Sequence, residues 1–384
     1  KNIDTSIYKQ ASSELKVGYV DGFIGYIGYD MVKVFEPKLH STMDNLTDEL
    51  NTPDLDLILP KIVLVYSHKN HQLTLISTIK DISEKFEMIE NELKGSYEYM
   101  HMKRNLGEDK GSFAHTKEQF FKMVDDSKEM IRSGDVFQIL ITNRFTRNIK
   151  VDPFSFYRIL RTKNPSPYMF LLEYEDFNIV GSSPEVMVRL TNGELLLRPI
   201  AGTRKRGTTK QRDKELEEEL LNDPKELSEH LMLIDLGRND VSRVAKTGSV
   251  KVEDMMHIER FSHVMHIVSD VTATIADDKD MFDLFMATFT AGTMTGAPKI
   301  RAMELIAEFE GLKRGFYSGS VGYFGFDGNM DSAITIRTAM VKEDKVILQA
   351  GAGVVADSQN ELEYLEVKNK LGALVASLED LDEK

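Results

Sequence analysis

The sequence predicts an antiparallel α+β fold. Strand-like segments alternate apolar and polar residues and follow one another at hairpin spacing. Helical segments with recognisable start signals lie between groups of these strands, and the sequence lacks the regular strand, helix, strand order of a parallel sheet. The 384 residues, 41% of them hydrophobic, are enough for one substantial core or for two of ordinary size.

The first part of the chain, residues 1–105, is predicted to be a mixed region. A Gly-rich alternating segment at residues 22–29 and an apolar segment at residues 61–66 are typical of strands. Residues 94–111 are polar and without pattern, which predicts a linker. We therefore divide the chain into an N-terminal region, residues 1–105, and a second domain, residues 106–384.

The second part opens with a clear helix signal. Thr116 and Gln119 form a capping box before an amphipathic helix that stops at Gly134. Strands are then predicted from the alternation of apolar residues. Their ranges are 136–145, 168–174, 186–190, 194–200 and 264–275.

A hairpin is predicted near the C-terminus. Residues 317–326 and 333–341 form its arms, joined by the turn pair Asp327 and Gly328, and residues 345–350 would extend it to a meander. Arg337 then falls in the middle of the second arm among apolar residues. Such an arginine either has an anionic partner or points to solvent, and the sequence favours neither.

Composition excludes several classes of protein. The 62 Asp and Glu residues outnumber the 48 Lys and Arg residues, giving a net charge of -14, which disfavours a nucleic-acid partner. No apolar run approaches the ~18 residues of a membrane helix. The absence of Cys excludes disulfides and thiolate sites and is consistent with a cytoplasmic location. Because the chain begins with Lys1, we expect a further segment to precede it.

Two helix starts carry acidic residues in a repeated pattern. One begins with Asp223 as N-cap and Pro224 behind it, the other with Ser358. Each helix then presents two glutamates, three residues apart, on one face. Two such pairs could hold a hard cation, although each pair alone is ordinarily an acidic helix surface. The pairs are Glu226 with Glu229 and Glu363 with Glu366.

Two Gly-rich segments are candidate anion sites. Residues 292–298 precede a helix that ends at Gly311, and residues 350–353 lie at the end of a strand. Backbone N–H groups exposed in such segments can bind a carboxylate. The alternative is that they are only a tight loop and a strand bend. Neither has the Gly-Lys-Ser/Thr ending of a nucleotide loop, so phosphate is not the favoured anion.

His263 and His266 are candidate ligands of a metal ion. The residues around them alternate as in a strand, and positions three apart on a strand face opposite sides. This argues against chelation by both. One buried histidine could act as an acid or hydrogen-bond donor, or could be a packed structural residue.

Several longer motifs occur together and in order. They are similar to motifs of the chorismate-utilising enzymes, and the resemblance spans residues 115–375. The motifs are Gly-Ser-Ser-Pro-Glu at 181–185, Arg-Pro-Ile-Ala-Gly-Thr at 198–203, Asp-Leu-Gly-Arg-Asn-Asp at 235–240, Gly-Thr-Met-Thr-Gly-Ala-Pro-Lys at 292–299 and Ala-Gly-Ala-Gly at 350–353.

The resemblance implies a fold of two large antiparallel sheets packed as a sandwich with helices around them. It also implies Mg²⁺ as cofactor, held by Glu229 and Glu366 with Glu226 and Glu363 in support. The metal would bind the ring carboxylate of chorismate, with Gly202, Thr203 and Thr293 around it. The enolpyruvyl carboxylate and the remaining substrate contacts are then expected at Tyr317, Arg337, Gly351, Gly353 and Lys370.

The reaction within this family depends on two lysine positions. Relatives that add water carry a lysine where this chain has Gln138, and many relatives that make aminodeoxychorismate carry one where it has Ala201. An enzyme that resembles the family but lacks both lysines is expected to use external ammonia. This implies a Mg²⁺-dependent lyase that forms anthranilate and pyruvate at the first committed step of tryptophan biosynthesis.

The resemblance also implies roles in that reaction. Glu185 is expected to act as general acid and base, and His266 to assist departure of the C4 hydroxyl. The rival readings are aminodeoxychorismate synthesis for the p-aminobenzoate branch and a chorismate-binding subunit without catalysis.

A partner subunit and a regulatory site follow from the same resemblance. Without Cys the chain holds no cysteine-type glutaminase, so a separate glutamine amidotransferase subunit is expected to supply ammonia. Tryptophan-inhibited relatives carry a Leu-Leu-Glu-Ser motif and an Asn-Pro-Ser-Pro-Tyr-Met run. Only the run is present, at residues 164–169, which argues against feedback binding by the chain as given. Residues 1–105 would be the remainder of a regulatory or partner-facing region.

Overall fold

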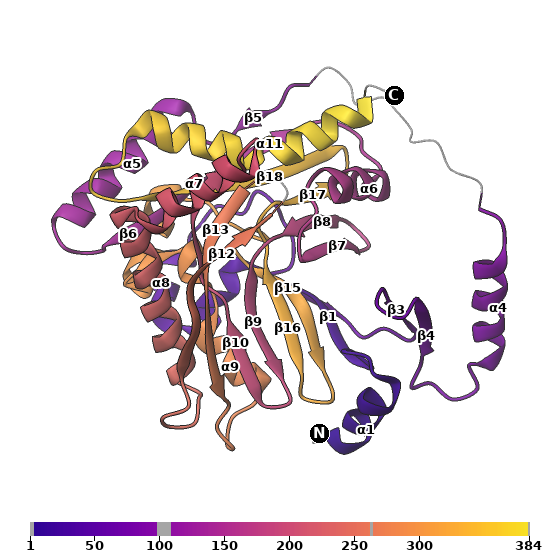
Figure 1. The fold of residues 1–384 in the computed structure, drawn as a ribbon. Helices are drawn as coiled ribbons and strands as arrows, with labels where there is room; N and C mark the ends of the chain where they lie inside the picture. Colours follow the sequence, from indigo (N-terminus) through magenta and orange to yellow (C-terminus); the bar gives the residue numbers. More distant parts are fainter. Residues whose placement is uncertain (1–3, 98–108, 262–263, 383–384) are drawn as a thin grey trace.

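A computed structural model describes residues 4–97, 109–261 and 264–382. It contains two large sheets with helices around them and a small sheet made of β3 and β4 (Figure 1). Every pairing between named strands in the described ranges is antiparallel, as predicted. Within these ranges, no helix combines the length and apolar character that a membrane crossing requires.

The larger sheet has nine strands. Their order is β11-β13-β10-β9-β16-β15-β1-β2, and β12 pairs with β13 beside that path. The strands are β1 (Gly22–Ile27), β2 (Leu55–Ile58), β9 (Val186–Thr191), β10 (Glu194–Leu197), β11 (Ile200–Lys205), β12 (Lys251–Arg260), β13 (Val264–Thr274), β15 (Ser320–Gly325) and β16 (Met330–Ile334).

The second sheet has seven strands. Their order is β14-β6-β18-β17-β8-β7, and β5 pairs with the far end of β6. The strands are β5 (Ser112–Phe113), β6 (Gln138–Arg147), β7 (Tyr168–Glu173), β8 (Asn178–Ser183), β14 (Gly296–Ala297), β17 (Thr338–Lys342) and β18 (Lys345–Val354).

The two sheets face each other across one hydrophobic core. Ile179 and Met340 of the seven-stranded sheet belong to the same buried cluster as Met187, Val271 and Phe324 of the nine-stranded sheet. Alternation along each strand sends one set of side chains into this layer, where their removal from water stabilises the pair of sheets. The sandwich implied by the family resemblance is therefore confirmed.

A second core lies on the outer face of the seven-stranded sheet. Helices α5 (Lys117–Arg132), α6 (Pro153–Lys163), α10 (Lys299–Glu310) and α11 (Asn360–Asp382) contribute to its apolar cluster, together with β6 and β18. α11 lies along β18 and contacts both α5 and α6. Figure 1 shows α11 along the top of the molecule.

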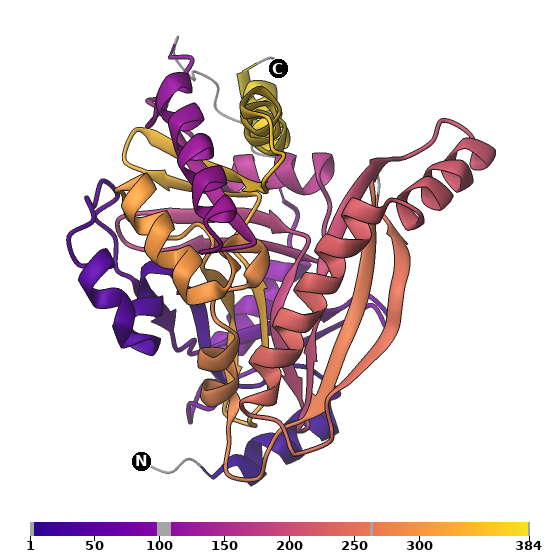
Figure 2. The ribbon, with the colours of Figure 1, turned by 90° about the vertical axis from the view of Figure 1, so that its left-hand side faces the viewer.

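Helix α8 (Pro224–Ser242) packs on the nine-stranded sheet, against β11 and β13. Figure 2 shows it lying lengthwise beside β12 and β13, with α7 (Lys210–Leu221) before it. α9 (Met281–Thr288) packs against β9, and the short 3-10 helix η3 (Gly292–Met294) follows it. The remaining elements are α1 (Thr5–Leu15), η1 (Tyr29–Met31), α2 (Val32–Phe35), η2 (Pro37–Leu39), α3 (His40–Met43), β3 (Val63–Ser67), β4 (Gln72–Ile76) and α4 (Ser83–Lys94).

The predicted helix starts are found close to their expected positions. Thr116 and Gln119 form the complete capping box of α5. The Asp223 carboxylate accepts hydrogen bonds from the first turn of α8, and Gly311 ends α10 in the left-handed region, at φ 64°. At the start of α11 the hydroxyl of Ser358 accepts its hydrogen bond from the Val355 amide, upstream of the helix.

Two predicted strands are divided in the structure. The strand expected at residues 194–200 ends at Leu197, and β11 then starts at Ile200, with both parts pairing to β13. The hairpin arm expected at residues 333–341 is also wrong, because β16 ends at Ile334 and β17 begins at Thr338 in the other sheet. Arg337 is therefore not inside a strand. It lies in the link between the sheets, at φ 51°.

Part of the N-terminal region is built into the larger sheet. β1 pairs with β15 from Gly22 opposite Gly325 to Ile27 opposite Ser320, and β2 adds to its other edge. Most of the predicted linker lies outside the described residues. The division of the chain near residue 105 stays a prediction.

Candidate functional site

The predicted site residues come from both sheets and from the helices next to them. Glu185 lies just before β9, and its carboxylate accepts a 2.9 Å hydrogen bond from the Thr293 hydroxyl in η3. Burial raises the pKa of Glu185 to about 7, against the opposing effects of Thr293, Lys370 and Arg337. A carboxyl group with such a pKa can carry or release a proton near neutral pH, as acid and base catalysis requires.

Arg337 and Tyr317 form a polar pair close to Glu185. Burial lowers the pKa of Arg337, while the neighbouring Tyr317, Glu366 and Glu185 favour its charged form. No hydrogen bond or ion pair holds this guanidinium within the described part of the chain. A partly buried arginine without a partner is suited to an incoming anion. Burial raises the pKa of Tyr317 to about 12, against the opposing effects of Arg314, Arg337 and the Gly351 backbone.

His266 projects from β13 toward β11. Its Nδ1 lies 2.8 Å from the Gly202 carbonyl oxygen and 3.2 Å from the Thr203 hydroxyl. Because a carbonyl oxygen only accepts, Nδ1 carries the proton in the neutral ring and Nε2 is free to accept. Burial, together with the charge of Arg337, lowers the pKa of His266, and the Gly202 bond opposes this. His263 lies outside the described residues.

The backbone at Gly202 requires glycine. Its φ is 63°, and a Cβ there would lie 3.0 Å from Leu220 and 3.1 Å from a carboxylate oxygen of Glu226. A larger residue would be strained and would press on the acidic side chains behind it. This close approach brings β11 against the start of α8.

Each acidic residue of α8 has a polar partner. Glu226 pairs with Arg204 at 3.0 Å, and Glu229 accepts a 3.3 Å hydrogen bond from the Gln138 amide. Burial raises the pKa of Glu229, and the charges of Glu226 and Glu366 raise it further. The two predicted glutamate pairs therefore interact electrostatically, although they come from helices far apart in the sequence.

The acidic residues of α11 are paired in the same manner. Glu366 forms a 2.6 Å ion pair with Lys370, whose Nζ also donates to the Gly351 carbonyl oxygen at 2.8 Å. Burial raises the pKa of Glu363, and the charge of Glu366 adds to the shift. Lys370 thereby connects this helix to the Gly-rich segment of β18.

The four glutamates are the candidate ligands of a metal ion. Among residues 4–97, 109–261 and 264–382, no group of three or more His, Cys, Asp or Glu side chains is arranged so that it could hold a metal ion. Burial raises the pKa values of Glu229 and Glu363, neighbouring carboxylates raise them further, and a divalent cation would favour the ionised form of both. Oxygen ligands of this kind suit Mg²⁺, provided that Glu226 and Glu366 release Arg204 and Lys370. The four carboxylates are therefore chemically suitable ligands for Mg²⁺.

The Gly-rich segment of β18 passes close to its neighbours. A Cβ at Gly351 would lie 2.8 Å from the Thr142 side chain and 2.9 Å from the Ile141 carbonyl oxygen, and one at Gly353 would lie 2.7 Å from the Gln138 amide. Pairing with β17 stops at Leu348, so beyond it one edge of β18 faces the site. The predicted anion segment is therefore part of a strand rather than a bend after it.

A family model described as chorismate binding enzyme matches residues 2–376. The chain belongs to this family. Anthranilate synthase component 1 from Aquifex aeolicus is 46% identical over 374 residues, covering 94% of this chain and 75% of the relative. The same-named protein from Acinetobacter calcoaceticus is 46% identical over 373 residues, with the same coverage.

Solved structures of related proteins have the same fold as this chorismate binding enzyme. Anthranilate synthase component I from Streptococcus pneumoniae superposes with a TM-score of 0.86 at 36% identity, covering 93% of this chain and 81% of that one. The menaquinone-specific isochorismate synthase from Escherichia coli reaches 0.75 at 18% identity, covering 94% and 89%, and shares the fold.

Some polar contacts of this chorismate binding enzyme could not be read from its sequence. The sequence marks Gln138 only as a position where some relatives carry a lysine. In the structure its side-chain amide donates to Glu229, which lies 91 residues further along the chain. Arg204 was not singled out, and it holds Glu219, Asp223 and Glu226 together. The only available signal for Arg204 is its place directly after the Ala-Gly-Thr motif, which gives no indication of its partners.

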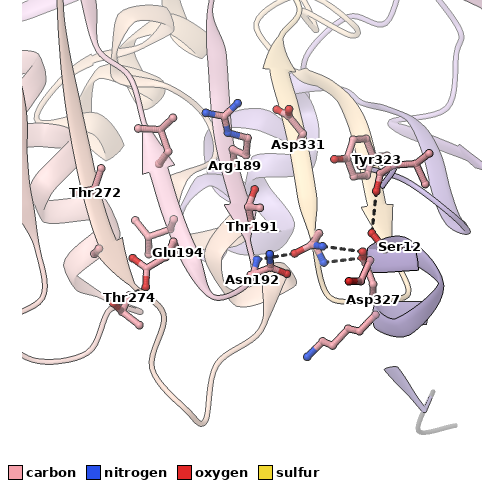
Figure 3. Close-up of a pocket in the computed structure, with 18 of the residues that line it drawn as sticks. Ser12, Arg189, Thr191, Asn192, Glu194, Thr272, Thr274, Tyr323, Asp327 and Asp331 are labelled. Atoms are coloured by element: carbon pink, nitrogen blue, oxygen red, sulfur yellow. Dashed lines mark hydrogen bonds between the residues drawn. The ribbon is translucent and has the colours of Figure 1, made fainter. Parts of the chain in front are cut away.

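A large groove lies away from the predicted site residues. It has a volume of ≈ 1050 Å³ and is lined by α1 and by the strands of the nine-stranded sheet near Arg189, Tyr323 and Asp331 (Figure 3). None of the predicted site residues lines it. The hydroxyl of Tyr168, in the Asn-Pro-Ser-Pro-Tyr-Met run, donates to Asp331 at 2.8 Å. This run therefore adjoins the groove, and the expectation about feedback binding stays a prediction.

Proposed function

We propose that this chorismate binding enzyme converts chorismate and ammonia to anthranilate, pyruvate and water with Mg²⁺. The observation that carries the proposal is the guanidinium of Arg337, to which the residues in the described ranges supply no hydrogen bond or ion pair, near a buried acid, Glu185, whose pKa is about 7. One group can receive a carboxylate of the substrate and the other can move its protons. The relatives named anthranilate synthase component 1 support the same reaction.

The two carboxylates of the substrate would be bound at separate places. Arg337, Tyr317 and the Gly351 amide are suited to the enolpyruvyl carboxylate. Gly202 and Thr203 lie next to the acidic cluster and would adjoin the ring carboxylate, with Thr293, Gly353 and Lys370 completing the surroundings. Glu226, Glu229, Glu363 and Glu366 would hold Mg²⁺, which when bound neutralises the ring carboxylate and withdraws electron density from the ring.

The chain's own residues would then serve two steps. Ammonia attacks C2, the ring double bond shifts, and the C4 hydroxyl leaves as water. His266 is the group proposed to assist this departure, and it must first gain a proton at Nε2, which a bound dianion would favour. Glu185 then takes the C2 proton and returns one to the enolpyruvyl methylene as the C–O bond breaks, releasing pyruvate.

The two lysines expected in other family members, a base in those that add water and a nucleophile in those that make aminodeoxychorismate, are both absent. Gln138 and Ala201 occupy those positions, and Gln138 is bonded to Glu229. We therefore propose ammonia as the nucleophile, supplied by a separate glutamine amidotransferase subunit, as the name component 1 of the relatives implies. We also propose a cytoplasmic location, on the basis of the Cys-free composition.

The test is to incubate the purified chain with chorismate, Mg²⁺ and excess ammonium at mildly alkaline pH. We expect anthranilate fluorescence, with pyruvate in equal amount, and its loss on addition of EDTA. Chorismate consumed without fluorescence would instead identify an aminodeoxychorismate synthase. Unchanged chorismate would contradict catalysis altogether.

A further inference from the structure

A small, partly open space is lined by Glu185. It has a volume of ≈ 30 Å³ and runs between α8 and the start of β9. Glu185 and Thr293 form its polar end, while Leu233, Leu236 and Gly237 of α8 form one wall. A volume of this size accommodates about one water-sized molecule.

The space continues the candidate site along α8. Glu229 belongs to the acidic cluster, and Leu233, one turn later on the same helix, lines the space. On the sheet side, Pro199 lines it just before β11, the strand that carries Ala201. Ala201 is the position where ring-attacking relatives are expected to carry a lysine. A molecule held here would therefore lie near the place where a nucleophilic amine is needed.

Most polar groups around the space are already engaged. Arg198 is paired with Asp270 at 2.7 Å, Asp240 with Lys299 at 2.5 Å, and the Thr288 hydroxyl donates to the main chain. The Glu185 carboxylate accepts a hydrogen bond from Thr293, and a carboxylate can accept several. A small ligand would thus bond mainly to Glu185 and otherwise contact apolar walls.

We propose that this space is the binding site of the ammonia molecule that attacks the ring. The inference rests on the proposed function. The apolar walls offer few acceptors for the four N–H groups of ammonium, and only neutral ammonia has the lone pair that attacks the ring. The nitrogen lone pair forms the bond to C2 as the C4–O bond breaks, and the hydroxyl takes a proton from His266 and leaves as water. The nitrogen then gives up one proton, which restores the protonated His266, so that Glu185 stays free to take the C2 proton.

The first test fills the space with one methyl group. A Cβ at Gly237 would lie 3.0 Å from Leu197 and 3.8 Å from Pro199, so Gly237→Ala narrows the space. With ammonium as sole nitrogen source, we expect the KM for ammonia to rise at least about tenfold, as for a methyl group in a tight pocket. The KM for chorismate should change less than about twofold, because no carboxylate-binding group is touched.

The matched control is Gly372→Ala in α11. Nothing lies within 4 Å of a Cβ there, so the same helical exchange adds a methyl group in open space. Both KM values should stay as in the wild type. If Gly237→Ala leaves the ammonia KM unchanged, or raises both KM values equally, the site is not in this space. Failure of the wild type to make anthranilate would overturn the proposed function instead.

A second variant enlarges the space and remains informative if Gly237→Ala does not fold. Leu236 is only partly buried and covers Gly292, so Leu236→Ala opens the wall at limited cost. We expect it to accept methylamine and form N-methylanthranilate, detected by mass spectrometry, while the wild type gives none. Equal methylamine use by both proteins, or by neither, would contradict the proposal.

Discussion

Glu185 is a carboxyl group whose proton affinity is set by its removal from water. It is buried, and its pKa is raised to about 7 although Thr293, Lys370 and Arg337 all act to lower it. We expect Glu185→Gln to reduce anthranilate formation by about 10²- to 10⁴-fold, because glutamine keeps the shape but cannot transfer a proton. Binding of chorismate, measured by calorimetry, should change little. A variant with near wild-type turnover would remove Glu185 from the mechanism.

The same shift predicts how stability depends on pH. The folded-state pKa of Glu185 lies above that of the unfolded chain, so this group's contribution is full at low pH and is lost as pH rises toward about 7. Glu185→Gln should therefore match the wild type near pH 4, below the pKa of the unfolded chain, and be more stable near pH 8, by up to about 3 kcal/mol. Urea unfolding at the two pH values measures this. A difference that does not vary with pH would contradict the shift.

Arg337 offers a planar group for a carboxylate. Arg337→Lys keeps the charge but loses the two-pronged geometry, so we expect the KM for chorismate to rise roughly tenfold or more. Arg132, which is exposed on α5 with Glu129 at 3.9 Å, is a matched control, and Arg132→Lys should leave the KM unchanged. An Arg337→Lys enzyme with an unaltered KM would place the substrate elsewhere.

At the scale of elements, Arg204 joins three segments. It extends from β11 and bonds Glu219 of α7, the cap residue Asp223, and Glu226 of α8, at 2.8–3.0 Å. We expect Arg204→Ala to lower the free energy of unfolding by about 1–3 kcal/mol, because it leaves partly buried carboxylates unpaired. Arg212→Ala, which breaks one exposed pair with Glu215 on α7, should cost less than about 0.5 kcal/mol. If denaturant unfolding shows the same loss of stability for Arg204→Ala and Arg212→Ala, Arg204 does not stabilise the junction of these segments.

Local signals explain which elements could be predicted from the sequence. The capping box at Thr116 and the cap at Asp223 act within four residues, so the helix starts follow from nearby side chains alone. The pairing of strands, by contrast, depends on segments that lie far apart in the sequence. Ile334, Ile336 and Ala339 continue one apolar pattern across the link from β16 to β17, because both sheets bury their inner faces. The apolar pattern therefore gives no sign that the chain passes from one sheet to the other at the link that contains Arg337.

The site shows the same limit. The four glutamates could be grouped by helix spacing and by family resemblance, and the structure shows coupling between the pairs. Their present partners, Arg204 and Lys370, could not be identified, since neither pattern nor spacing gives contacts between helices and sheets. The left-handed φ of Arg337, 51°, was likewise unexpected for a residue with a long side chain.

At the scale of the whole molecule, one buried ion pair joins distant parts. Arg314 is fully buried and bonds Glu310, the Met294 carbonyl oxygen in η3 and the Leu140 carbonyl oxygen in β6. Arg314→Leu leaves Glu310 without its partner, so we expect a loss of about 3–5 kcal/mol of stability. The double variant with Glu310→Leu should lose less than the sum of the two single variants, which a double-mutant cycle in urea measures. Strict additivity would contradict coupling.

The crossover at Arg337 also bears on how the enzyme recognises its substrate. Arg337 and Gly351 belong to the link and to the seven-stranded sheet, whereas Gly202, Thr203 and His266 belong to the nine-stranded sheet. The separation between the two proposed carboxylate sites would therefore depend on how the two sheets pack against each other. Substitutions in the core between the sheets, at side chains that do not touch the substrate, would then change which dianions fit.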